Sequence, residues 1–175
     1  TLSPKEREEK LEKEAQEVLP EQPTSEVETV PPGVAVKPLS SSESISDIRN
    51  ELRLIETLTI SKFESEFKLR AERDVGIGDT GVSFDALFQT GGKLTFLEVK
   101  SIRHPNTVSM LLDRVLYNAL LADRFLNSNF KLILAVVYQF DKEELPRVEN
   151  AWRRRVEKCP ASIELRFISR AELDA

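Results

Sequence analysis

The feature that most constrains the fold of this chain is an uninterrupted apolar run, LILAVVY, at residues 132–138. The run is far shorter than the roughly 18 apolar residues that a membrane-spanning helix needs. It is rich in β-branched residues, and such a run is typical of a strand that is covered on both faces. It therefore predicts a sheet with helices packed on both sides.

Helical and extended patterns alternate on either side of this run. Apolar residues recur at helical spacing from Ile45 to Phe63, which predicts a helix of about five turns before the first strand. The expected helices lie at 45–67, 104–127 and 145–158, and the expected strands at 68–78, 81–89, 93–102, 131–140 and 162–169. A further helix is expected to begin near residue 170. The order α-β-β-β-α-β-α-β predicts an α/β domain with one mixed sheet flanked by helices.

The first part of the chain differs from the rest in composition. Residues 1–40 hold nine acidic and five basic residues, and residues 21–44 are rich in Pro, Ser and Glu. We therefore expect a flexible tail or linker at 1–43 and a folded domain at 44–175. A short helix at 4–18 fits the capping pattern, but its apolar positions are too few to hold it on a core. A docking peptide is the minority interpretation of this segment.

Composition also excludes several classes of protein. The net charge of −5 excludes a uniformly basic protein that coats nucleic acid, whereas the balanced charge of residues 41–175 leaves a local basic site open. Cys159 is the only cysteine, so no internal disulfide forms, and the single histidine argues further against a zinc site. We expect a cytoplasmic protein without a membrane segment. Because the chain begins with Thr1 rather than Met, we expect a fragment of a longer protein.

The most informative stretch is SFDALFQTGGKLTFLEVKS, at residues 83–101. Its two central glycines lie between two strand patterns, which predicts a hairpin with a two-residue loop. In that register Asp85 faces Glu98, and the period-two alternation of a strand puts both on one face with Lys100. The expected neighbours on this face are Leu87, Leu94 and Phe96, and the expected residues of the other face are Phe84, Ala86, Phe88, Leu97 and Val99.

Two opposed carboxylates on a partly covered face need a counter-charge. They would lie ~5 Å apart and repel each other, and burial strengthens the repulsion. Lys100 supplies one positive charge, and Mg²⁺, which prefers oxygen ligands, would supply two more. A lysine beside a metal-bound water can orient that water for attack on a phosphate. The alternative is a hairpin whose acids and lysine form ordinary surface salt bridges.

This stretch resembles the PD-(D/E)xK nuclease superfamily, which has the restriction-endonuclease-like fold. The resemblance covers residues 45–168 and implies a phosphodiesterase that uses Mg²⁺, with Mn²⁺ as a substitute. It also implies that Asp85 and Glu98 bind the metal, that the main-chain carbonyl of Val99 is a further ligand, and that Lys100 acts on the attacking water. The sequence departs from the family in having Phe84 where the family has proline before the aspartate.

Many members of the superfamily add a glutamate from the first helix to the site. The candidates in this chain are Glu51, Glu56, Glu64 and Glu66. We prefer Glu56, because it lies far enough up the helix to lean over the hairpin. Glu64 is the main rival, since it follows Phe63 in a pair that resembles the one in Mrr-like nucleases.

Candidate contacts with nucleic acid lie just beyond the lysine. Arg103 and His104 follow the strand, and Arg114 lies on the polar side of the next helix, so each could contact phosphates. We expect a metal-dependent nuclease acting on nucleic acid, in the first instance DNA, with specificity from a missing N-terminal region or a partner subunit. Strandedness, endo or exo cleavage and homo-oligomer formation stay open. The alternatives are a non-catalytic nucleic-acid-binding or protein-assembly module of the same fold, and a pure protein-interaction domain.

Overall fold

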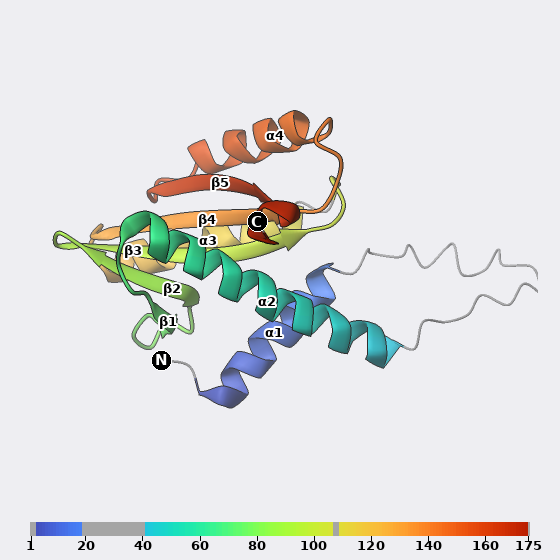
Figure 1. The fold of residues 1–175 in the computed structure, drawn as a ribbon. Coiled ribbons are helices and arrows are strands. Elements are labelled where there is room, and N and C mark those ends of the chain that lie inside the picture. Colours follow the sequence, from blue (N-terminus) through green and yellow to red (C-terminus); the bar gives the residue numbers. More distant parts are fainter. Residues whose placement is uncertain (1–2, 19–40, 107–108, 175) are drawn as a thin grey trace, which may run out of the picture.

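The computed structural model describes residues 3–18, 41–106 and 109–174. Its helices are α1 (Pro4–Val18), α2 (Ser41–Phe67), α3 (Ser109–Phe125), α4 (Leu145–Glu157) and the short 3₁₀ helix η2 (Arg170–Asp174). Its strands are β1 (Glu72–Gly76), β2 (Ser83–Thr90), β3 (Lys93–Ile102), β4 (Phe130–Tyr138) and β5 (Ile163–Ser169). The element order predicted for the folded domain is therefore confirmed (Figure 1).

The five strands form one mixed sheet in the order β1-β2-β3-β4-β5. The pairs β1–β2 and β2–β3 are antiparallel, whereas β3–β4 and β4–β5 are parallel. The two parallel pairs are joined through α3 and α4, because a parallel connection must cross over a face of the sheet. The apolar run at 132–138 lies in β4, which is buried along almost its whole length, as predicted.

Helices cover both faces of the sheet, so the predicted α/β class is confirmed. Ile55, Ile60 and Phe63 of α2 pack on one face (Figure 1). On the other face, Leu112 of α3 and Trp152 of α4 are both fully buried. The sheet therefore separates two apolar layers, one under α2 and one under α3 and α4. Within the described ranges, no helix combines the length and apolar character needed to cross a membrane.

The predicted hairpin register is confirmed from the loop inward. Thr90 pairs with Lys93, and the same register continues to the pair Ala86–Leu97, one residue short of Asp85 and Glu98. Both loop glycines, Gly91 and Gly92, have positive φ, at 51° and 87°. This is the backbone conformation that a tight turn between twisted strands requires and that glycine adopts without strain.

The predicted face of Phe84 is wrong. Its ring packs with Phe96 and Phe130, at centroid distances of 5.1 and 5.8 Å, and not with Ala86. The strict alternation fails because β2 is paired with β3 only as far as Ala86, whereas its pairing with β1 continues to Ser83. On β1, the residue facing this point is Asp74, which has a positive φ of 52°. Released from β3, β2 turns here, and the residue before the candidate aspartate moves to the other apolar layer.

The helix predicted at 4–18 forms α1, but the expectation that it could not be held on a core is wrong. Leu11 is only 2 % exposed and packs with Ile48 and Leu52 of α2. Glu8 forms ion pairs with Arg49 and Arg53 of the same helix. Among the described side chains of α1, this one apolar contact is therefore accompanied by charged contacts with the same helix. The segment at 19–40, for which the sequence predicts a linker, lies outside the described residues.

Candidate metal and catalytic site

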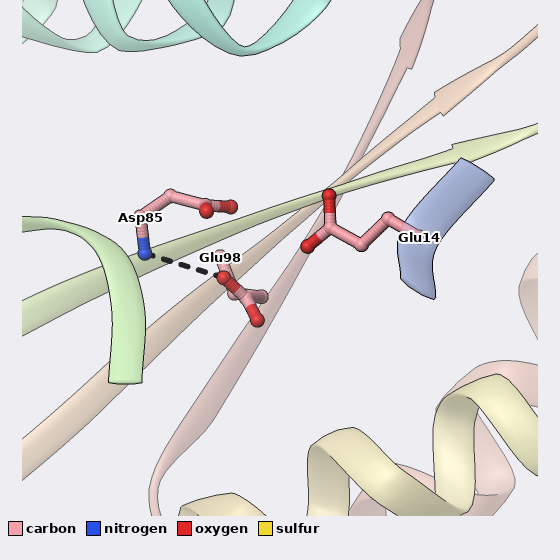
Figure 2. Close-up of side chains that lie close together, drawn as sticks. All are labelled: Glu14, Asp85 and Glu98. Carbon is pink, nitrogen blue, oxygen red and sulfur yellow. Dashed lines mark hydrogen bonds between the residues drawn. The ribbon is translucent and has the colours of Figure 1, made fainter. Parts of the chain in front are cut away.

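Asp85 and Glu98 meet where β2 separates from β3. The main-chain N–H of Asp85 donates to Oε1 of Glu98 at 3.2 Å (Figure 2). The N–H of Val99 donates to Oδ2 of Asp85 at 2.8 Å. Beyond Ala86–Leu97, the last residue pair between β2 and β3, the two carboxylates thus accept the main-chain hydrogen bonds. Both side chains are buried, with 2 % and 4 % exposure. The two acids from neighbouring strands therefore lie together at the point where the pairing of β2 with β3 ends.

Lys100 lies two residues beyond Glu98 on β3 and is also buried. Its Nζ is 3.9 Å from Oε2 of Glu98 and 3.3 Å from Oε1 of Glu14. Burial alone would lower the pKa of Lys100, but Glu14 and Glu98 raise it above its usual value. Lys100 is therefore a stable cation beside the carboxylate pair. The structure brings together the three residues that the hairpin pattern predicted.

Helix α1 contributes two further residues that sequence reasoning missed. Nζ of Lys10 lies 3.0 Å from Oδ1 of Asp85 and 3.3 Å from Oε1 of Glu98. Glu14, one helical turn later, reaches Lys100 and is itself buried (Figure 2). The available signal was the spacing of Lys10 and Glu14, which puts opposite charges on one face of the helix. Nothing in their local sequence indicates which part of the fold that face meets.

Among the four candidate glutamates of α2, Glu56 is the one whose pKa is shifted by acids of the site, Asp85 and Glu14. It is 6 % exposed, and its pKa is raised to about 9 by burial first and then by the charges of Asp85 and Glu14. A carboxyl group in this environment carries a proton at neutral pH. The preference for Glu56 thus agrees with its place in the structure, and its catalytic role stays a prediction.

The other three candidate glutamates of α2 have partners elsewhere. Glu51 forms an ion pair with Arg170 at 2.6 Å, and Glu66 forms one with Arg166 at 3.2 Å. Glu64 accepts a hydrogen bond from the main-chain N–H of Ala71 at 2.9 Å. The rival candidate Glu64 therefore stabilises the connection between α2 and β1.

Protons and lysines balance the negative charge of the site. Burial and then the neighbouring Asp85 raise the pKa of Glu98 well above its usual value, and burial also raises the pKa of Glu14. Burial would raise the pKa of Asp85 too, but Lys10 and hydrogen bonds from Glu98 and Val99 lower it. Asp85 therefore keeps its negative charge more readily than Glu98, which is the more easily protonated member of the pair.

The donor set fits a hard divalent cation. Glu14, Asp85 and Glu98 each offer an oxygen, and these oxygens lie within 4.8 Å of one another. Carboxylate oxygens in this number suit Mg²⁺, which completes its shell with waters. The ammonium of Lys10 contacts two of the same carboxylates, so a metal ion would have to displace it. The N–H of Val99 contacts Asp85, whereas its carbonyl stays a predicted ligand.

The predicted nucleic-acid contacts lie at the end of β3 and on α3. Arg103 follows the last residue of β3 and is half-buried, and its Nε has no hydrogen-bond partner among the described residues. His104 and Arg114 are exposed. Arg103 and His104 are thus close in sequence to Lys100 and at least partly open to solvent, while Arg114 belongs to the helix layer opposite α2. Contact with nucleic acid stays a prediction for all three.

Comparisons of the chain with models of known protein families, with curated proteins and with solved structures find no match. The functional argument therefore rests on the chemistry of the site itself. Its central elements are the buried pair Asp85 and Glu98, the lysine beside them, and the helix that covers all three.

Proposed function

We propose that the chain is a Mg²⁺-dependent nuclease of the restriction-endonuclease-like fold, which hydrolyses phosphodiester bonds of nucleic acid, in the first instance DNA. The observation that carries the proposal is the buried pair Asp85 and Glu98 with Lys100 beside it, where two strands separate. Two buried carboxylates in contact destabilise a fold unless a cation neutralises them, so such clusters concentrate at functional sites. The element order and the mixed sheet support the same proposal.

In this proposal each residue has a separate role. Asp85 and Glu98, with the carbonyl of Val99, hold the metal, which when bound stabilises negative charge on the phosphate oxygens. Lys100 orients the attacking water and keeps its charge because its carboxylate neighbours raise its pKa. Glu56 lies behind Asp85 as a protonated acid and limits the negative charge of the site until the metal binds.

The test is cleavage of plasmid DNA, single-stranded DNA and RNA with Mg²⁺ or Mn²⁺. We compare the wild type with Lys100→Ala and, as a matched control, with Lys93→Ala, an exposed lysine on the same strand. Cleavage should be lost in Lys100→Ala and kept in Lys93→Ala, with the circular dichroism of both unchanged. Equal cleavage by Lys100→Ala and the wild type would show that the activity comes from elsewhere.

The second candidate function is a non-catalytic nucleic-acid-binding or assembly module of the same fold. The contact of Lys10 with both carboxylates favours it, because a lysine already neutralises the pair. Calorimetric titration with Mg²⁺ separates the two functions. Binding that disappears in Asp85→Asn supports the nuclease, whereas nucleic-acid binding without any metal binding supports the module.

A further inference from the structure

One face of α1 matches the charges of the candidate site residue by residue. Arg7 pairs with Asp74 of β1 at 3.4 Å, Lys10 contacts the carboxylate pair, and Glu14 contacts Lys100. The positions 7, 10 and 14 lie on one side of a helix, three and four residues apart. These three residues therefore all contact the site or its rim.

The contacts of Lys10 and Glu14 place charges where a nuclease would bind its metal ion and its phosphate or water. The ammonium of Lys10 lies between Asp85 and Glu98, where a metal cation would be held. The carboxylate of Glu14 lies 3.3 Å from Nζ of Lys100, where an anionic phosphate or the attacking water would be oriented. A positive group faces the metal ligands and a negative group faces the lysine.

We propose that α1 is an intramolecular cap, which competes with the metal ion and with nucleic acid for the site. The inference rests on the proposed nuclease function. While α1 is docked, Asp85, Glu98 and Lys100 are at most 9 % exposed, so a phosphodiester of a polymer has no access to them. Undocking of α1 removes Lys10 from the metal ligands and Glu14 from the lysine in one movement.

The apolar part of the α1 contact is small enough for docking to be reversible. Among the described side chains of α1, Leu11 is the one buried apolar residue, so undocking exposes a single apolar side chain among them. The ion pairs of Glu8 with Arg49 and Arg53 are exposed, and exposed ion pairs contribute little to stability.

A rival interpretation is that α1 stays docked and that Glu14 is a third metal ligand. The two interpretations make opposite predictions for Glu14→Gln. Loss of a ligand would weaken metal binding, whereas a weaker cap would strengthen it or leave it unchanged. Lys10→Met removes the competing cation and should strengthen metal binding under the proposal.

The main experiment uses the full chain and leaves the site itself intact. Leu11→Asp puts a charge against Ile48 and Leu52 and should release α1, and Leu54→Asp is the matched control at an exposed leucine of α2. If α1 is docked in about nine molecules of ten, its release should tighten the apparent Mg²⁺ affinity about tenfold. Mg²⁺ titration calorimetry measures this affinity, and DNA cleavage should rise in parallel.

Hydrogen exchange gives a readout that does not depend on activity. A helix of the length of α1 is marginal in water by itself, so its amides are protected mainly while it is docked. Under the proposal, saturating Mg²⁺ in the wild type should speed exchange in α1 and leave exchange in β4 unchanged.

Three results would overturn the cap. They are equal or weaker Mg²⁺ binding by Leu11→Asp, weaker binding by Glu14→Gln, and α1 amides that stay protected at saturating Mg²⁺. Binding and cleavage that are equal in the wild type and Leu11→Asp would refute the cap alone. Absence of Mg²⁺ binding in both would refute the proposed nuclease function and the cap with it.

Discussion

The β2–β3 hairpin and helix α1 both place charged groups in the same site, but different interactions hold them there. The hairpin is fixed by a tight turn, a continuous register and two buried faces. Among the described side chains, helix α1 is held by one buried leucine and by charges that match those of the site. Under the proposed function the hairpin is the rigid scaffold of the catalytic groups, and the proposed cap α1 is the more weakly anchored element that controls access to them.

The two lysines of the site provide the strongest test of this difference. Lys100 belongs to the scaffold, and Lys100→Ala should reduce DNA cleavage about 10³-fold, which corresponds to roughly 4 kcal/mol of transition-state stabilisation. Lys10 belongs to α1, and Lys10→Ala should leave cleavage unchanged or increase it. Initial rates at saturating Mg²⁺ measure both variants. A similar loss in the two would mean that α1 is part of the catalytic machinery.

The loss of unfolding free energy on substitution of a buried leucine should also differ between the hairpin and α1. Leu97 is fully buried under α2, and Leu97→Ala should lower the free energy of unfolding by about 3 kcal/mol through the cavity it leaves. Leu11 is almost as buried, yet Leu11→Ala should lower it by about 1 kcal/mol or less, because α1 can undock without global unfolding. Urea unfolding followed by circular dichroism measures both values. Equal losses would show that α1 unfolds together with the sheet.

The buried acid on α2 predicts an unusual dependence of stability on pH. The pKa of Glu56 is about 9 in the fold and near 4.5 when unfolded, so the folded state binds the extra proton between these values. Stability therefore falls as the pH rises from about 4.5 to about 9. Glu56→Gln should remove this loss, which already amounts to on the order of 2 kcal/mol at pH 6.

The control for this prediction is Glu66→Gln, on the same helix. Glu66 is exposed and pairs with Arg166, and a surface pair of this kind contributes ~1 kcal/mol or less. Thermal unfolding at several pH values compares the two variants with the wild type. A Glu56→Gln protein with the pH profile of the wild type would show that Glu56 does not carry the proton.

The smallest expected effect concerns the turn that sets the hairpin register. Gly91 has a φ of 51° and open space where a Cβ atom would lie, so Gly91→Ala should cost about 1 kcal/mol from backbone strain alone. Gly76 has the same open space without a positive φ, and Gly76→Ala should cost less. Chemical unfolding resolves the difference. Equal values would mean that the loop relaxes to another turn type.

Local patterns were sufficient to predict most of the scaffold. The paired glycines predicted the register, and the apolar run predicted the central strand with both faces covered. The same reasoning brought Asp85, Glu98 and Lys100 together, because a register converts sequence distance directly into spatial proximity. Glu56 was preferred because it lies far enough up the helix to lean over the hairpin, and the effect of Asp85 on its pKa agrees with that preference.

Contacts that depend on the end of an element or on distant charges could not be predicted in the same way. Phe84 changes face because strand pairing stops at Ala86, and no residue type marks that point. Helix α1 docks because Lys10 and Glu14 find opposite charges on strands that lie far along the chain. Such complementarity becomes visible only when the fold has placed both partners.

The separation of the two apolar layers gives the protein a natural optical probe. Trp152 is the only tryptophan, is fully buried on α4, and packs edge-on against Phe167 at 6.0 Å. It belongs to the layer under α3 and α4, whereas α1 packs against α2 on the other side of the sheet. Its fluorescence should therefore change when the sheet unfolds and stay unchanged when α1 undocks. An emission spectrum thus distinguishes a protein with an opened site from an unfolded protein.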